Sequence, residues 1–244
     1  MGSTRLFATA AAALTIAGCT PLTTTGFDTL APGSERIEVR VPAWRDGAIA
    51  IDGVASGHVR RRTTGREEVR DWFGLERAWI ERSGHFAFTA RGPRVGGEIA
   101  GDCVYGRSER QARSGALAIA EPDAPLRLRC SFARDGVALG ALALDGGEAA
   151  GDDAAFDARV GDVRVGDTLL GIRSLHRVGT GRGFPTDAPA GYAFEGADGS
   201  AIGGVDVSGG ATRRLSLPTG GPARDAALAA GLALALFWDP GDVD

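Results

Sequence analysis

Pro222–Asp239, PARDAALAAGLALALFWD, decides the fold, because its residues from Ala226 to Trp238 are apolar without interruption. Alanine, leucine and glycine fill the segment, and no β-branched residue disfavours a helix. A helix through it has no polar face, and such a helix is buried in protein or in lipid. The run is shorter than the roughly 20 apolar residues of a membrane span, which favours a protein core. The sequence therefore predicts a buried C-terminal helix over 222–239.

The chain before this helix has the pattern of many short strands. Arg36–Val41 alternates isoleucine and valine with charged residues, which is the period of a half-buried strand. Leu126–Phe132 alternates in the same way, and similar segments recur between glycine-containing turns. A strand-rich chain that ends in one apolar helix predicts a mainly β fold. We expect a closed or nearly closed antiparallel β-barrel of roughly 12 strands around that helix.

Two segments of this strand-rich region are harder to assign. Residues 69–82 suit a helix and a pair of strands equally well, so both structures stay open. Arg107–Arg113 is polar and charged, which predicts a loop. Residues 35–244 as a whole are expected to form a single barrel domain that includes the core helix.

The N-terminus resembles the signal of a bacterial lipoprotein. Arg5 provides a positive charge, an apolar segment spans 6–17, and Ile16-Ala17-Gly18-Cys19 resembles the lipobox. The resemblance implies that residues 1–18 are removed and that Cys19 carries acyl chains such as palmitate, which hold the protein on a membrane. An ordinary secretory signal with an incidental cysteine is the alternative.

The residues after Cys19 indicate a compartment. Thr20 rather than an aspartate follows the cysteine. By the sorting pattern of lipoproteins in Gram-negative bacteria, this implies the outer membrane, with the protein facing the periplasm. Residues 19–34 contain threonine, proline and glycine and are expected to form a flexible tether between the lipid and the barrel.

Cys103 and Cys130 are the two cysteines that remain after Cys19. Each lies in a strand-like segment, and export to an oxidising compartment allows such a pair to form a disulfide. In the chain-entropy description, closing this loop stabilises the fold by about 3–4 kcal/mol. Two buried free thiols are the alternative.

The C-terminal part of the chain resembles the tubby-like superfamily, which includes scramblases and LURP-one-related proteins. The resemblance is carried by Asp198-Gly199-Ser200-Ala201-Ile202-Gly203 and by the helix that ends Leu234-Ala235-Leu236-Phe237-Trp238-Asp239. In that superfamily a closed β-barrel surrounds an apolar C-terminal helix, so the resemblance implies the same architecture here. The usual members are not lipoproteins, and their basic lipid-contacting positions do not align residue by residue with this chain.

Residues that carry enzyme chemistry are sparse. All 27 basic residues are arginine, so mechanisms that require lysine are excluded, and the net charge of −4 disfavours a nucleic-acid partner. His58, His85 and His176 match no metal-binding spacing, and no nucleophile-elbow motif occurs. We therefore expect no catalytic residue, no metal and no cofactor. A periplasmic hydrolase that combines one of these histidines with an aspartate is the alternative function.

Arginines are the candidate binding residues. Arg60, Arg61 and Arg62 form the densest basic patch, and in a strand Arg61 points away from the other two. Arg182 lies in the glycine-rich loop 179–184, whose backbone amides suit an anion. Because arginine binds phosphate bidentately, these four residues predict contact with phospholipid headgroups. A solvated strand face is the alternative for Arg60, Arg61 and Arg62, and a mobile loop is the alternative for Arg182.

These features predict a non-enzymatic outer-membrane lipoprotein that serves binding or envelope assembly. The expected partners are the membrane, through acylated Cys19, and a phospholipid or an envelope protein. A purely structural subunit of an envelope complex is a further alternative.

Overall fold

The computed structural model describes residues 22–43, 46–53, 55–72, 75–114, 117–147 and 157–239. The predicted signal peptide 1–18 and the predicted acylation residue Cys19 lie outside these ranges. The described elements, in chain order, are η1 (Phe27–Thr29), β1 (Glu35–Arg40), β2 (Gly47–Ile51), β3 (Ala55–Trp72), β4 (Leu75–Gly92), β5 (Gly97–Ser114), β6 (Leu117–Arg134), β7 (Val137–Gly146), β8 (Arg159–Val165), β9 (Thr168–Leu175), β10 (Arg177–Val178), β11 (Phe184–Pro185), β12 (Gly191–Glu195), β13 (Ala201–Asp206), β14 (Thr212–Leu217) and α1 (Gly221–Leu236).

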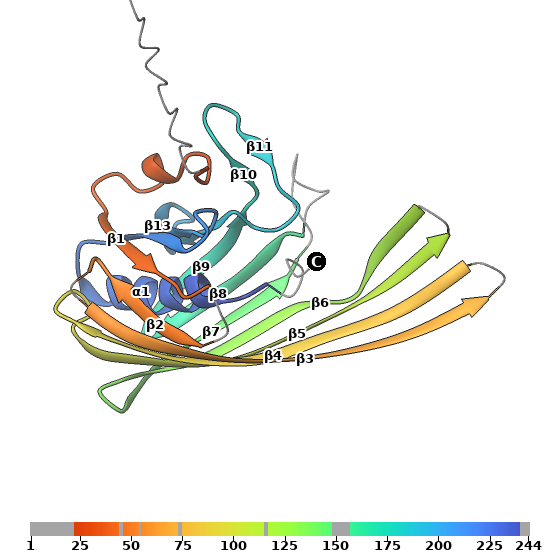
Figure 1. Ribbon diagram of the computed structural model, residues 1–244. Helices are drawn as coiled ribbons and strands as arrows, with labels where there is room; N and C mark the ends of the chain where they lie inside the picture. Colours follow the sequence, from red (N-terminus) through yellow and green to blue (C-terminus); the bar gives the residue numbers. More distant parts are fainter. Residues whose placement is uncertain are drawn as a thin grey trace, which may run out of the picture.

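Twelve of these strands form one closed barrel (Figure 1). Around the barrel the order is β1, β14, β13, β12, β9, β8, β7, β6, β5, β4, β3 and β2, and neighbouring strands are antiparallel. Strand β1 closes the barrel, because it pairs with β14 on one side and with β2 on the other. Strands β10 and β11 form a separate hairpin. The predicted fold class, an antiparallel barrel with one C-terminal helix, is confirmed.

Helix α1 lies inside the barrel. Its residues from Ala226 to Leu236 are all buried, and the helix packs against β8, β9, β13 and β14 (Figure 1). Small residues allow this close approach, since a Cβ atom on Gly231 would lie 2.8 Å from a methyl carbon of Leu215. Burying the leucines of the helix stabilises the fold by about 6–12 kcal/mol before entropy costs. None of the helices in the described ranges is long and apolar enough to span a membrane.

The helix ends earlier than the predicted range 222–239. It stops at Leu236, and Phe237 is extended with φ −65° and ψ 127°. The carbonyl of Leu236 would accept its next helical hydrogen bond from residue 240, which is a proline and has no N–H. The residue before a proline also avoids the helical conformation, which keeps Asp239 out of the helix.

Strands β3, β4, β5 and β6 are much longer than the rest, with 18 residues each. At about 3.3 Å per residue, each measures about 60 Å, which is far longer than an ordinary barrel strand. Their outer halves leave the barrel together as one four-stranded antiparallel sheet (Figure 1). We call residues 63–72, 75–84, 107–114 and 117–125 the projecting sheet.

The projecting sheet accounts for both segments that were hard to assign. Residues 69–82 contain the end of β3 and the start of β4, so the strand alternative is correct. The loop predicted for Arg107–Arg113 is wrong, because these residues lie within β5. Charged residues occupy both faces of the projecting sheet, although Ala78, Ile80 and Glu109 on one face are buried. The regular alternation that marks a half-buried strand is therefore weak in its sequence.

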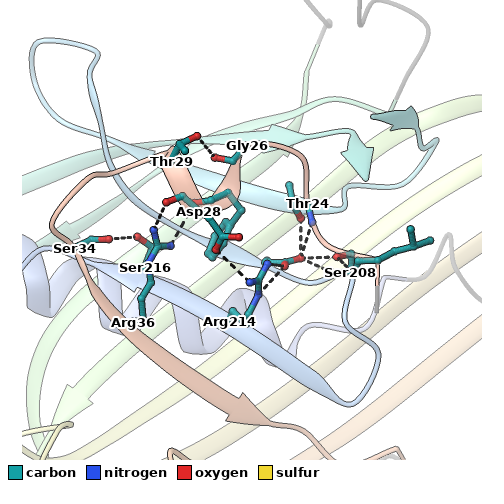
Figure 2. A network of polar contacts seen from close by, with 12 residues as sticks. Thr24, Gly26, Asp28, Thr29, Ser34, Arg36, Ser208, Arg214 and Ser216 are labelled. Atoms are coloured by element: carbon teal, nitrogen blue, oxygen red, sulfur yellow. Dashed lines mark hydrogen bonds and ion pairs between the residues drawn. The ribbon is translucent and has the colours of Figure 1, made fainter. Parts of the chain in front are cut away.

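The segment from Leu22 to Ser34 is fixed to the barrel, which differs from the flexible tether expected for 19–34. The hydroxyl of Thr24 donates a hydrogen bond of 2.7 Å to the carboxylate of Asp206, at the end of β13 (Figure 2). Phe27 is 1% exposed, and the guanidinium of Arg214 lies 5.2 Å from its ring centroid. These partners are far away in the sequence, so local composition alone does not reveal them.

Candidate functional site

The interior of the barrel is packed with side chains. Inward-facing residues of the wall, such as Phe86, Phe194 and Leu215, belong to one apolar cluster with α1 and are at most 1% exposed. Phe237 continues this cluster, with its ring centroid 5.2 Å from that of Tyr105 in an edge-on arrangement. The candidate functional surfaces are therefore those on the outside of the molecule.

The projecting sheet has two long edges. Strand β2 pairs with β3 only as far as Val59, so residues 60–72 have no strand neighbour on that side within the described ranges. Strand β7 pairs with β6 only from Arg127 onward, which leaves 117–126 equally without an outer strand neighbour in the described part of the chain. An unpaired edge presents backbone N–H and C=O groups to any extended segment that approaches it.

The two edges differ in chemistry. The β3 edge is exposed and charged, and charged side chains are a common protection of an edge against pairing. The β6 edge begins with Leu117 and Ile119, which are 75% and 71% exposed. Pro122 and Pro125 follow, and proline cannot donate to a strand partner. The part of the sheet best suited to accept another strand is therefore the outer end of β6, from Leu117 to Glu121.

The sheet bends where it leaves the barrel. The register between β5 and β6 shifts between Gly106 and Ser108, and again between Ser108 and Glu109. Such irregularities bend strands and are frequent beside functional sites. A groove of about 500 Å³ lies at this bend, and Trp79 and Arg127 are among the residues that line it.

Trp79 is the aromatic residue of this groove. Strand pairing places it opposite Glu68 on β3 and opposite Arg110 on β5, so these side chains share one face of the sheet. The guanidinium of Arg70 lies 5.4 Å from the centroid of the Trp79 ring. Tryptophan beside arginine is typical of the anchor residues of protein interfaces.

Arg61 is buried in the barrel, where it binds the end of α1, and it is not accessible to a lipid headgroup. It is 6% exposed, and its Nε and Nη2 atoms donate hydrogen bonds of 3.0 and 2.7 Å to the carbonyl of Leu236 at the end of α1. Its guanidinium also lies 5.0 Å from the ring centroid of Trp238. Burial lowers the pKa of Arg61 to about 10, so the side chain remains charged at neutral pH. The prediction that Arg61 belongs to a headgroup-binding patch is therefore wrong.

A second buried arginine holds the chain that follows the helix. Arg159 is 1% exposed, forms ion pairs with Asp157 and Asp239, and donates to the hydroxyl of Tyr192 at 3.1 Å. Burial lowers the pKa of Arg159, but Tyr192, Asp239 and Asp157 outweigh it and raise the pKa above its ordinary value. Burial has the opposite effect on the phenol of Tyr192, whose pKa it raises to about 12, because it disfavours the charged form. This cluster stabilises the end of the barrel at which α1 terminates.

The other predicted lipid-binding arginines lie on separate elements. Arg60 and Arg62 are exposed on β3, on the face opposite to Arg61, as the strand alternation predicts. Arg182 is exposed between β10 and β11. Its carbonyl accepts a hydrogen bond of 3.3 Å from Arg177. The four arginines therefore do not form one common patch.

The three histidines occupy three different environments. His58 is exposed on β3, and His85 lies 2.9 Å from a carboxylate oxygen of Asp102 on the outer surface. His176 is buried, with Nε2 2.9 Å from the hydroxyl of Ser174 and Nδ1 3.2 Å from the carbonyl of Thr186. The three histidines are thus dispersed over the described part of the chain, on β3, on β4 and after β9.

Cys103 and Cys130 face each other across β5 and β6 and form a disulfide, with Cα atoms 4.1 Å apart. The pair lies in the barrel halves of these strands. It closes the loop that contains the second hairpin of the projecting sheet. The described residues contain no group of three histidine, cysteine or acidic side chains arranged to hold a metal ion.

In the polar network at the N-terminal segment, Thr24, Ser208 and Arg214 converge on one carboxylate, that of Asp206 (Figure 2). Its carboxylate accepts hydrogen bonds from the hydroxyls of Thr24 and Ser208 and from the guanidinium of Arg214, at 2.6 to 2.7 Å. Burial raises the pKa of Asp206, but the hydrogen bonds from Ser208, Arg214 and Thr24 outweigh it, so the pKa is lower than its ordinary value. The network therefore fixes the chain close to the predicted anchor.

Comparison with protein-family models, with curated proteins and with solved structures finds no match to this chain.

Several residues of the candidate surface have no motif in the sequence. Trp79 lies in the segment whose helix or strand structure the pattern left open, and Ile119 lies in a short apolar stretch that also suits a buried strand. The signal that was present is the density of charged residues around Trp79, which is unusual for a strand inside a barrel wall.

Proposed function

We propose that the protein is a lipid-anchored, non-enzymatic assembly module of the bacterial envelope, and that it presents the projecting sheet to a protein partner. The observation that carries this proposal is the pair of long sheet edges that have no strand neighbour in the described ranges. Apart from Ala78, Ile80 and Glu109, the described side chains of the projecting sheet are not buried, so the sheet gains little from burial of its own. Binding of a partner supplies the missing contacts.

The partner is expected to add an extended strand to the outer end of β6. In this mode of recognition, backbone hydrogen bonds supply affinity and alternate side chains supply specificity. Leu117 and Ile119 point to the same face of the strand, so the partner strand should carry apolar residues opposite them. Trp79 and its groove lie on the same sheet and provide a second anchor for the partner.

The anchor and the compartment are supported by the sequence of the N-terminus. Residues 1–18 and Cys19 resemble a lipoprotein signal, and Thr20 favours the outer membrane facing the periplasm. The barrel around a C-terminal helix supports kinship with the tubby-like superfamily. In this proposal the barrel is the scaffold, and the projecting sheet is the surface that binds the partner.

Photo-crosslinking in intact cells tests the proposal. A photoreactive residue in place of Ile119 should give a protein adduct, whereas one in place of Leu169 should not. Leu169 is a matched control, because it is 48% exposed on β9, away from the projecting sheet.

The substitution Leu117→Ser should reduce the adduct formed at position 119, since both side chains contact the same partner strand. Mass spectrometry of the adduct shows whether the partner is a second copy or another envelope protein. Equal adducts from both positions, or an adduct at 119 that Leu117→Ser leaves unchanged, would contradict the proposal.

A further inference from the structure

The hairpin of β10 and β11 is attached to the chain that comes from Cys19. Thr24 forms a β-bridge with Val178. On either side of this bridge, the N–H of Thr25 donates to the carbonyl of Arg177, and the N–H of Gly179 donates to that of Thr23, both at 2.8 Å. The N-terminal segment thus lies beside β10 and is joined to it by one β-bridge and two flanking backbone hydrogen bonds.

The spacing along the chain keeps this hairpin close to Cys19. Only two residues separate Cys19 from Leu22, where the described part of the chain begins. Even a fully extended chain covers at most about 11 Å over these three steps. The network around Asp206 fixes the following residues, so the hairpin cannot move far from the anchor.

The hairpin is held in one orientation by its own contacts. The hydroxyl of Thr25 donates to the carbonyl of Gly179 at 3.1 Å, and Arg177 donates to the carbonyl of Arg182 at 3.3 Å. Gly183 has φ 64°, a conformation that favours glycine, and it turns the chain into β11. The turn between β10 and β11, which contains Arg182, therefore has a fixed conformation.

The exposed side chains beside the anchor have the chemistry of a membrane interface. Phe184 is 73% exposed on β11, and Leu22 is 58% exposed two residues before Thr24, which bridges to β10. Arg182 is exposed two residues before Phe184. Apolar side chains flanked by arginine are the usual composition of segments that lie in the headgroup region of a bilayer.

We propose that Leu22 and the β10–β11 hairpin form a membrane-contact surface. Phe184 enters the interface of the phospholipid leaflet that holds acylated Cys19, and Arg182 meets the headgroup phosphates. This inference rests on the proposed lipid anchor and deepens it, because it fixes which side of the barrel faces the membrane. In Figure 1 the hairpin lies on the side of the barrel opposite to the wall formed by β3 and β4.

Fluorescence quenching in vesicles tests this surface. The full-length acylated protein is reconstituted into vesicles of phosphatidylethanolamine and phosphatidylglycerol that contain phospholipid brominated near the headgroup end of the acyl chain. Phe184→Trp is compared with Val137→Trp, since Val137 is 71% exposed at the start of β7. The turn between β6 and β7 lies at the other side of the barrel from the hairpin (Figure 1).

The tryptophan introduced at position 184 should lose fluorescence in the brominated vesicles, and the one at position 137 should not. Equal fluorescence changes in two variants that both float with the vesicles would overturn the contact surface and leave the anchor intact. Failure of both variants to float would overturn the anchor, and the contact surface with it. Flotation therefore separates the two failures.

Discussion

The barrel halves and the projecting halves of β3, β4, β5 and β6 differ in how deeply their side chains are buried. In the barrel halves, inward residues such as Phe88, Ile99 and Leu128 are at most 2% exposed and pack in the core cluster. In the projecting sheet, charged residues stand on both faces, and Val69, Leu117 and Ile119 are at least half exposed. Backbone pairing between strands thus continues the sheet beyond the apolar core. The barrel halves contribute most of the stability of the fold, because their side chains are buried.

The largest expected difference is between two leucines of one strand. Leu128→Ala should lower the free energy of unfolding by about 2–5 kcal/mol, because Leu128 is fully buried and its truncation leaves a cavity. Leu117→Ala should change it by less than about 0.5 kcal/mol, since Leu117 is 75% exposed. Urea unfolding followed by circular dichroism measures both. Similar losses for the two variants would mean that the projecting sheet is part of the core.

A smaller effect distinguishes two neighbouring arginines. Arg61→Ala should cost about 1.5–3 kcal/mol of unfolding free energy, because it removes charged hydrogen bonds to the carbonyl of Leu236. Arg62→Ala should be nearly neutral, since Arg62 is exposed on the other face of β3. Chemical denaturation of both variants makes the test. Equal stability of the two would show that Arg61 does not hold the end of α1.

The smallest expected effect depends on pH and concerns the anchored end of the barrel. The pKa of Asp206 is lower in the folded protein than its ordinary value, so ionised Asp206 stabilises the fold above an ordinary pKa of about 4. This contribution is lost as the pH falls through the folded pKa. The gap in unfolding free energy between the wild type and Asp206→Asn should therefore shrink between pH 7 and pH values well below 4. A gap that stays constant over this range would contradict the role of the carboxylate.

Much of the barrel was predictable from the sequence. The apolar run from Ala226 to Trp238 indicated the core helix, and clean alternation in Arg36–Val41 and Leu126–Phe132 indicated wall strands. In the projecting sheet charged residues occupy both faces, so the alternation is weak there. For that reason Arg107–Arg113 looked like a loop, although it continues β5.

The sites were less predictable, because they depend on distant contacts. The alternation of Arg60, Arg61 and Arg62 correctly indicated opposite faces, but nothing nearby in the sequence showed that Arg61 binds the carbonyl of Leu236. The attachment of Thr24 to Asp206 likewise joins residues that are 182 positions apart. The threonine, proline and glycine of residues 19–34 therefore suggest a flexible segment, because the sequence does not show that Thr24 is bound by Asp206.

Hydrogen–deuterium exchange of the purified protein, read by mass spectrometry, tests the central claim most directly. The claim is that one continuous set of strands forms a packed barrel around α1 at one end and a solvated sheet at the other. Amides of Ala226–Leu236 and of the barrel halves should exchange slowly, while the edge amides of 63–72 and 117–124 should exchange fast. Fast exchange within α1, or uniform slow exchange along the full length of β3 and β6, would contradict the account.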